Sequence, residues 1–255
     1  MNIDTIHTDY TMLRLQAREL NDLMQTRIRS TNRFGAYQRA GGGEVFSMGD
    51  ALVETEKIVV KALEKRMRSI VGPHMQAFLE TPGIGDKTLA RLLGEIGHPV
   101  IAFPAHWAER PDAKGTVADP KRVLVQDEPF ERMVSQLWTY CGYGDAKNQR
   151  RKGMTQEEAF LCGNPRAKSL VYLMSSNCMK RTGEPDKNGV AKARSPYRNV
   201  YEETKAHYET VRPEWTPGHR NSAALRKCSK EILKDLWIAA KADLAEDTGE
   251  VLLAA

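Results

Sequence analysis

The stretch ETPGIGDKT, residues 80–88, combines residue types and spacing that could bind a phosphate group. Gly83 and Gly85 flank a single isoleucine, and glycine adopts a positive φ without steric cost, so a very tight turn between two helices is expected. A helix that starts near Asp86 presents unpaired amides and the positive end of its dipole, and both attract an anion. The pattern is typical of a helix-hairpin-helix element.

Side chains next to this turn add cations and a hydroxyl group to the predicted phosphate site. Lys87 and Thr88 fall in the first turn of the second helix, and Arg91 follows one turn later on the same face. Contacts of this kind hold a nucleic-acid backbone without reading its sequence. The alternative is a plain tight turn within a helical bundle.

Positive charge is concentrated in the middle of the chain. Residues 140–200 contain 12 basic and 5 acidic residues, whereas residues 1–139 contain 18 of each. A localised basic patch is typical of a protein that binds a polyanion, although a solvated surface can carry one by chance. The predicted second set of phosphate contacts in this region is Lys147, Arg150, Arg151, Lys152, Arg166 and Lys168. Trp215, in the loop-like segment WTPGH, is the tryptophan best placed to stack on a base.

Hydrophobic periodicity predicts two long helices in the first third of the chain. From Ile6 to Met24, apolar residues step by four and three, which is the spacing of a coiled-coil seam over residues 3–33. A glycine-rich break follows, and a second helix is expected over 51–79. The two helices could form an antiparallel hairpin or pair with a second copy of the chain. We therefore expect a coiled-coil helical hairpin over 1–79 and a compact domain over 80–255.

The second domain is expected to be mainly helical, so the whole chain is assigned to the mainly α class. Residues 98–129 look like an irregular insertion with one strand over 122–126, and residues 182–196 look like a polar, mobile loop. The expected helices of this domain are 87–96, which Gly97 ends, then 130–140, 166–179, 197–211 and 222–241.

Composition excludes several classes of protein. At 255 residues, with 41% hydrophobic and 28% charged residues, the chain is typical of a globular protein with a sizeable core. No apolar run is long enough to cross a bilayer, and the N-terminus does not have the pattern of a signal peptide. The four cysteines are far apart, which predicts free thiols in a reducing cytoplasm. Neither the cysteines nor the six histidines have metal-ligand spacing, so no metal or cofactor is expected.

Five blocks of sequence, in order, resemble one family. They are PGIGDKTLARLLGEIG, LWTYCGYG, GNPRAKSLVYLMSSNCMK, SPYRNVYEETKAHY and HRNSAALRKCSKEILKDLWIAA. Together they resemble the C-terminal half of the "IS one-ten" insertion-sequence transposases, and residues 3–79 look like the coiled coil that precedes that half. The resemblance implies DNA recombination by an oligomer that is guided by a structured RNA, with a RuvC-like domain and a nucleophilic serine.

Two departures from that family weaken the expectation of catalysis. No RuvC-like domain precedes the predicted coiled coil, and the stretch that should hold the serine contains only Thr155 as a hydroxyl residue besides Tyr143. We therefore expect a transposase-like DNA-binding protein that acts in transposition or recombination without its own catalytic centre. The alternatives are an active transposase completed by a separate RuvC-like partner, and an RNA-binding or genome-associated structural protein. A homodimer or higher oligomer is expected through the coiled coil.

Overall fold

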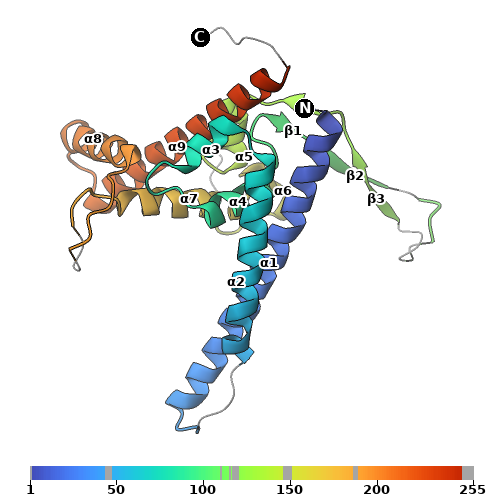
Figure 1. Ribbon diagram of the computed structural model, residues 1–255, viewed down its shortest axis with the longest axis horizontal. Coiled ribbons are helices and arrows are strands. Elements are labelled where there is room, and N and C mark those ends of the chain that lie inside the picture. Colours follow the sequence, from blue (N-terminus) through green and yellow to red (C-terminus); the bar gives the residue numbers. More distant parts are fainter. Residues whose placement is uncertain are drawn as a thin grey trace.

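The computed structural model describes residues 2–43, 48–109, 111–114, 116, 121–145, 151–185 and 189–248. Over these residues the protein is mainly helical, as predicted, with short strands between the fourth and fifth helices (Figure 1). The elements are α1 Ile3–Arg39, α2 Met48–Ile70, α3 Pro73–Leu79, α4 Asp86–Ile96, β1 Ile101–Ala102, β2 Ala105–Glu109, β3 Arg122–Gln126, β4 Phe130–Glu131, α5 Val134–Tyr140, α6 Gln156–Leu161, α7 Pro165–Met179, α8 Pro196–Val211 and α9 Pro217–Thr248.

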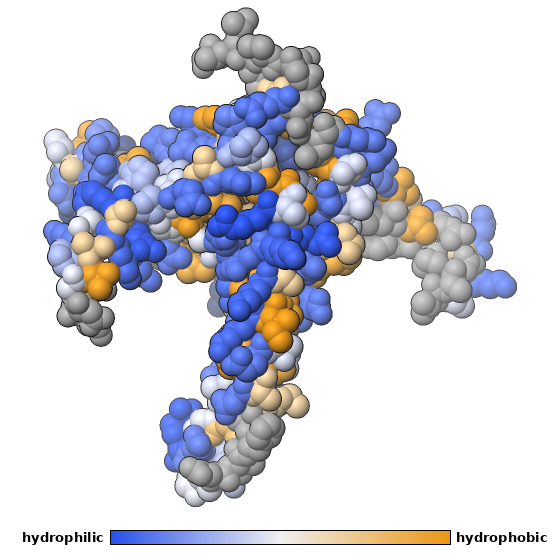
Figure 2. Space-filling model, in the orientation of Figure 1, coloured by the Kyte–Doolittle hydropathy of each residue, from blue (hydrophilic) through white to orange (hydrophobic). Residues whose placement is uncertain are grey.

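The first helix belongs partly to the core and partly to a projecting arm. The predicted seam residues from Ile6 to Leu20 are buried and pack into the same hydrophobic cluster as residues of α4, α7 and α9. Beyond them, α1 and α2 lie side by side in opposite directions and extend away from the rest of the molecule (Figure 1). We call this extension the arm. Figure 2 shows apolar side chains interrupting the hydrophilic surface along it.

A close contact fixes α1 against α4. A Cβ atom added at Gly94 would lie 2.6 Å from the Cβ of Ala17, so only glycine fits at this crossing without movement. Arg14, one turn before Ala17, donates its Nε hydrogen to the carbonyl oxygen of Gly94 at 3.1 Å. The two helices therefore meet through a small-residue contact, and a polar bond lies at its edge.

The helix predicted over 51–79 is wrong as a single element, because α2 ends at Ile70 and α3 begins at Pro73. Proline lacks an amide hydrogen and disfavours helical geometry at the residue before it, and Gly72 is extended, with φ −77° and ψ −179°. The carboxylate of Asp243, near the end of α9, accepts the amide hydrogens of His74 and Met75 at this break. The C-terminal helix therefore caps α3.

Residues 98–129 are more regular than predicted. The strand over 122–126 is confirmed, and it pairs with β2 in an antiparallel ribbon that runs from Ala105↔Gln126 to Glu109↔Arg122. The expected helix over 130–140 starts only at Val134, because Phe130 and Glu131 pair with β1. In Figure 1, the β2–β3 ribbon projects from the side of the molecule opposite α8.

The last three helices complete the core. α9 contributes Ile232, Leu233 and Leu236, which are fully buried, and the buried hydroxyls of Ser175 in α7 and Ser229 in α9 are hydrogen-bonded at 2.8 Å. All four cysteines are free, as predicted, and Cys162 alone is partly exposed. The isolated bridge between Pro185 and Ala191 gives the polar loop some order. None of the helices over the described residues is long and apolar enough to span a membrane.

Candidate nucleic-acid interface

The predicted turn connects α3 to α4, and its two glycines have different environments. Gly83 has a φ of 102° and is buried against α7, where an added Cβ would lie 2.6 Å from the Cα of Cys178. Gly85 is exposed, has φ −118°, and has nothing within 4 Å of an added Cβ. Ile84 between them is buried, and its amide donates to the Thr81 carbonyl at 3.0 Å. Of these three residues, Gly85 is therefore the one that is exposed to solvent.

Gly85 is also the N-cap residue of α4, and within the described structure no side chain caps this helix. The carbonyl of Gly85 accepts the amides of Thr88 and Leu89, at 3.0 and 2.9 Å. The positive end of the helix dipole therefore faces solvent at an open glycine, as expected for an anion site.

Two of the predicted phosphate contacts at this corner are wrong. Thr88 is only 8% exposed because it lies on the face of α4 that packs into the core, so its hydroxyl does not reach the surface. Gly83 is buried by α7 and does not offer the close backbone approach that was predicted for it. Both residues shape the corner from inside.

The cation predicted beside the corner is already paired. The Lys87 ammonium lies 3.1 Å from a carboxylate oxygen of Glu56 on α2, and the other oxygen of Glu56 lies 2.6 Å from Arg27 on α1. Burial raises the pKa of Glu56, but hydrogen bonds from Arg27 and Lys87 outweigh that effect and lower it overall. Asp86, the first residue of α4, pairs with Arg68 at 2.6 Å. The carboxylates of Asp86 and Glu56 therefore both lie next to the first turn of α4.

Arg91 and Arg166, which were predicted in separate sets, line one groove. This groove of about 430 Å³ lies between α1, α4 and α7. Arg166 lies 3.6 Å from Glu95, whose other carboxylate oxygen accepts the side-chain amide of Asn164 at 3.2 Å. Burial lowers the pKa of Arg91, and the carboxylates of Glu95 and Glu56 partly offset this. Glu95 therefore faces two guanidinium groups.

The basic segment before α6 is only partly described. Lys147 and Arg150 lie outside the described residues, whereas Arg151 and Lys152 are exposed. Met154 packs against the turn between α6 and α7, because its sulfur lies 3.9 Å from Cys162 Sγ. Met154 is held in turn to Arg151, whose amide lies 3.1 Å from its sulfur.

The hydroxyl of Thr155 has a structural role. It accepts the amide of Glu158 at 3.2 Å, and the Glu158 carboxylate accepts the amide of Thr155 at 2.8 Å. This reciprocal pair is a capping box at the start of α6, an element that was not predicted.

A second, larger cavity is lined by Lys168 and by residues that were not predicted. Its volume is about 780 Å³, and it is walled by α7, the first turns of α9 and the segment after α5. Lys168 and Arg226 line it together with the rings of Tyr143, Tyr172 and Trp215. Its remaining lining residues are Ser169, His219, Asn221, Ser222, Ala223, Leu225 and Ser229.

The groove and the cavity are adjacent, since Ser169 lines both of them. Among the described residues, the two share a charged lining of four cations and one carboxylate, that of Glu95. The four cations are Arg91, Arg166, Lys168 and Arg226, which we call the basic strip. In sequence these four cations span 135 positions, so no short motif predicts that they meet. Trp215 was the only ring of the cavity that its sequence context had singled out.

The described residues contain no cluster of three or more histidine, cysteine or acidic side chains that could hold a metal ion. Comparison with known proteins found no matching family model, curated protein or solved structure.

Proposed function

We propose that the protein binds DNA through the phosphate backbone, with the basic strip as the main contact surface. The observation that carries this proposal is the gathering of four cations, with one carboxylate among the described lining residues, in a groove and a cavity that share Ser169. Phosphate contacts made by Lys and Arg supply most of the affinity of non-specific nucleic-acid binding. The exposed pair Arg151 and Lys152 and the open N-terminus of α4 at Gly85 would extend the contact.

A role in DNA transposition or recombination in the cytoplasm is supported by the resemblance of five sequence blocks to the "IS one-ten" transposases. Binding without a catalytic centre of its own is supported by Thr155, because its hydroxyl is engaged in capping α6. A nucleophilic hydroxyl needs an adjacent base and a free approach to the phosphate.

We further propose that the arm pairs with a second copy of the chain. Ile58 on α2 is 69% exposed and Met48, at the start of that helix, is 58% exposed. Large apolar side chains on a helix that projects from the core favour helix–helix contact with a partner. Replacing Ile58 by lysine should then shift the sedimentation of the protein toward the monomer, and an unchanged distribution would contradict pairing through this face.

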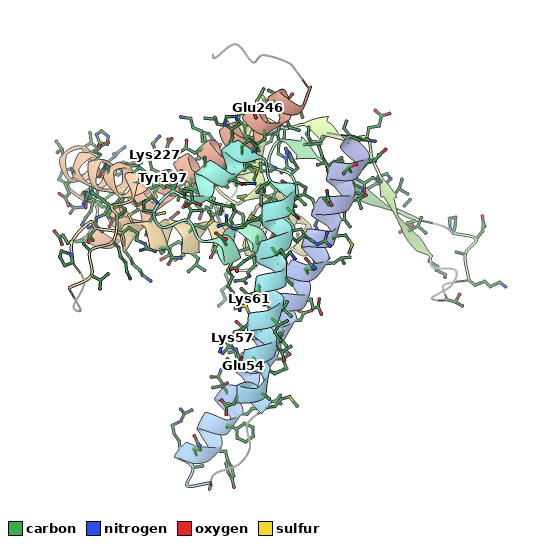
Figure 3. The ribbon with its side chains drawn as sticks, viewed as in Figure 1. Glu54, Lys57, Lys61, Tyr197, Lys227 and Glu246 are labelled. Carbon is green, nitrogen blue, oxygen red and sulfur yellow. The ribbon has the colours of Figure 1, made fainter. Side chains whose placement is uncertain are left out.

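Salt-dependent binding to a duplex tests the main proposal. The dissociation constant of a fluorescent 30-base-pair DNA would be measured from about 50 to 200 mM salt, and affinity should fall steeply. Replacing Arg166 and Lys168 together by alanine should weaken binding to all sequences alike and reduce the salt slope by about 2. The matched control removes Lys57 and Lys61, two cations on the arm (Figure 3), and should change the slope less. Equal losses in the two variants would refute the basic strip.

An RNA hairpin of the same sequence, measured at the same salt, separates the DNA proposal from RNA binding. Tighter binding of the duplex DNA is expected. Preference for the RNA would reassign the partner while keeping the surface.

A further inference from the structure

We infer, resting on the proposed function, that the cavity between α7 and α9 takes one unpaired nucleotide of a bound strand, with its phosphate on Lys168 and Arg226 and its base against Tyr172 and Trp215. Ligand pockets commonly measure about 300–1,000 Å³, and this cavity measures about 780 Å³. It therefore has room for a base, its sugar and the adjoining phosphate.

The lining of the cavity is rich in cations. No aspartate or glutamate is among the described residues that line it. Arg226 is held by main-chain carbonyls, since its Nη2 donates to the oxygen of Tyr143 at 3.1 Å and also to that of Gly144. These bonds position the guanidinium through neutral carbonyl groups. An anionic ligand would add the negative charge that these groups do not carry.

The side chain of Lys168 extends from α7 into the cavity and packs beside Gly142. Its Cδ passes Gly142, which has φ 73° and at which an added Cβ would lie 3.0 Å from that atom. No described carboxylate lies within ion-pair distance of its ammonium group. A half-buried stem whose ammonium pairs with no described carboxylate is suited to a phosphate oxygen.

The ring of Tyr172 is accessible, and that of Trp215 is held by its neighbours. Tyr172 is 54% exposed on α7. The ring of Trp215 packs on Tyr208 with a centroid separation of 5.0 Å, and its amide donates to the Arg212 carbonyl at 3.0 Å. A base stacked on aromatic side chains of this kind contributes to binding whatever its sequence, because every base has a π-face.

This combination favours a nucleotide over other ligands. A purely apolar ligand would leave two cations unsatisfied in the cavity, and a phosphate alone would leave the rings uncovered. Bases of an intact duplex are stacked and paired, so only an unpaired or extruded base can enter. The hydroxyl and amide groups of Ser169, Ser222 and Asn221 can bond to the edge of such a base.

The test compares three ligands at one salt concentration: a paired duplex, the same duplex with one bulged 2-aminopurine, and free AMP. The bulged duplex should bind about tenfold more tightly than the paired one, and its fluorescence should be quenched on stacking. Tyr172→Ala should abolish both the tighter binding and the quenching. The matched control is Tyr37→Ala, which removes an exposed tyrosine from α1.

The outcomes separate the two proposals. Equal binding of paired and bulged duplexes, with no quenching, would overturn the nucleotide assignment and leave DNA binding intact. Binding of AMP alone, lost in Tyr172→Ala, would keep the nucleotide chemistry of the cavity but refute the strand as its source and with it the proposed function. Failure of all three ligands to bind would overturn both.

Discussion

The carboxylate of Asp243 accepts the backbone amide of His74 at 2.8 Å, across 169 positions of sequence. Its other oxygen accepts the amide of Met75 at 3.1 Å, so the end of α9 caps the start of α3. Asp243 is 8% exposed, and an added Cβ at Gly72 would lie 2.4 Å from its Cγ. This contact ties the C-terminal helix to the helix that leads into the glycine corner.

Replacing Asp243 by asparagine should lower the free energy of unfolding by about 1–2 kcal/mol, because the amide keeps only one acceptor oxygen for two backbone donors. Urea denaturation at pH 7 measures the change. Glu246→Gln is the matched control, since its carboxylate pairs with His74 at the surface, 59% exposed, and should matter by less than about 0.5 kcal/mol. Equal effects would show that Asp243 acts only through its charge.

The two glycines of the corner should differ strongly in their tolerance of alanine. Gly83→Ala should destabilise the protein by about 2 kcal/mol or more, since it strains a positive φ and places a methyl group against the backbone of Cys178. Gly85→Ala should change the free energy of unfolding by less than about 0.5 kcal/mol, because its φ is ordinary and the space is open. Thermal and urea unfolding compare the pair, and similar losses would contradict the described corner.

Protonation of His98 should make stability depend on pH. Its Nδ1 accepts the amides of Val100 and Ile101 at 3.1 and 3.0 Å, and burial, with a smaller effect of Arg132, lowers its pKa to about 3. The unfolded chain binds a proton near pH 6.5, so this contribution is full above that pH and is lost as pH falls toward 3. The loss should be about 1.4 kcal/mol for each unit.

Unfolding free energies of the native protein and of His98→Gln, measured at pH 7.0 and pH 5.5, isolate the effect of this residue. The variant should be less stable at pH 7.0 and should lose less on acidification than the native protein. Parallel losses in the two proteins would place the pH dependence elsewhere.

Removing the charge of Glu56 should strengthen duplex binding if the corner contacts phosphate. Glu56→Gln leaves Arg27 and Lys87 without their shared carboxylate. The logarithmic salt slope should steepen by about 1 for each cation that then reaches a phosphate. Glu54→Gln is the control, because it releases Lys57 on the exposed arm (Figure 3). Unchanged binding in Glu56→Gln would remove the corner from the contact surface and leave the basic strip.

Periodicity predicted the first helix well, because burial follows the turn of a helix wherever one face meets a core. Ile6, Tyr10 and Leu13 are buried at the spacing that marked them as a seam. The same pattern did not show that their partners are α4 and the C-terminal helices as well as α2, since periodicity identifies a buried face and not what covers it.

The missed boundary between α2 and α3 follows from local backbone geometry. The dipeptide Gly72–Pro73 ends one helix and starts another, and its meaning could have been inferred from proline geometry alone. The pairing of β2 with β3 joins residues 13 to 21 positions apart, from Glu109↔Arg122 to Ala105↔Gln126, without the short turn that marks a hairpin in sequence. Strand propensity therefore identified only β3, the member rich in β-branched residues.

The candidate site was predictable in its residue types but not in its assembly. Arg91 and Arg166 were identified separately, and their meeting around Glu95 depends on how α4 packs against α7. Thr88 was wrongly predicted at the surface. Which face of α4 is buried depends on the helices that pack against it, and the local sequence does not give these. Tyr143 and Arg226 belong to no common motif, so the cavity that they share could not be inferred from the sequence.

The first helix runs without interruption from the core to the end of the arm. Its 37 residues correspond to about 55 Å of helix. Its N-terminal half is fixed against the core by the close contact at Gly94 and by the surrounding apolar side chains. Because the helix is continuous, the arm therefore projects from the core in a fixed direction. Two copies joined at their arms would hold their binding surfaces at a set separation, and that separation would select how far apart two segments of a polynucleotide can be gripped at once.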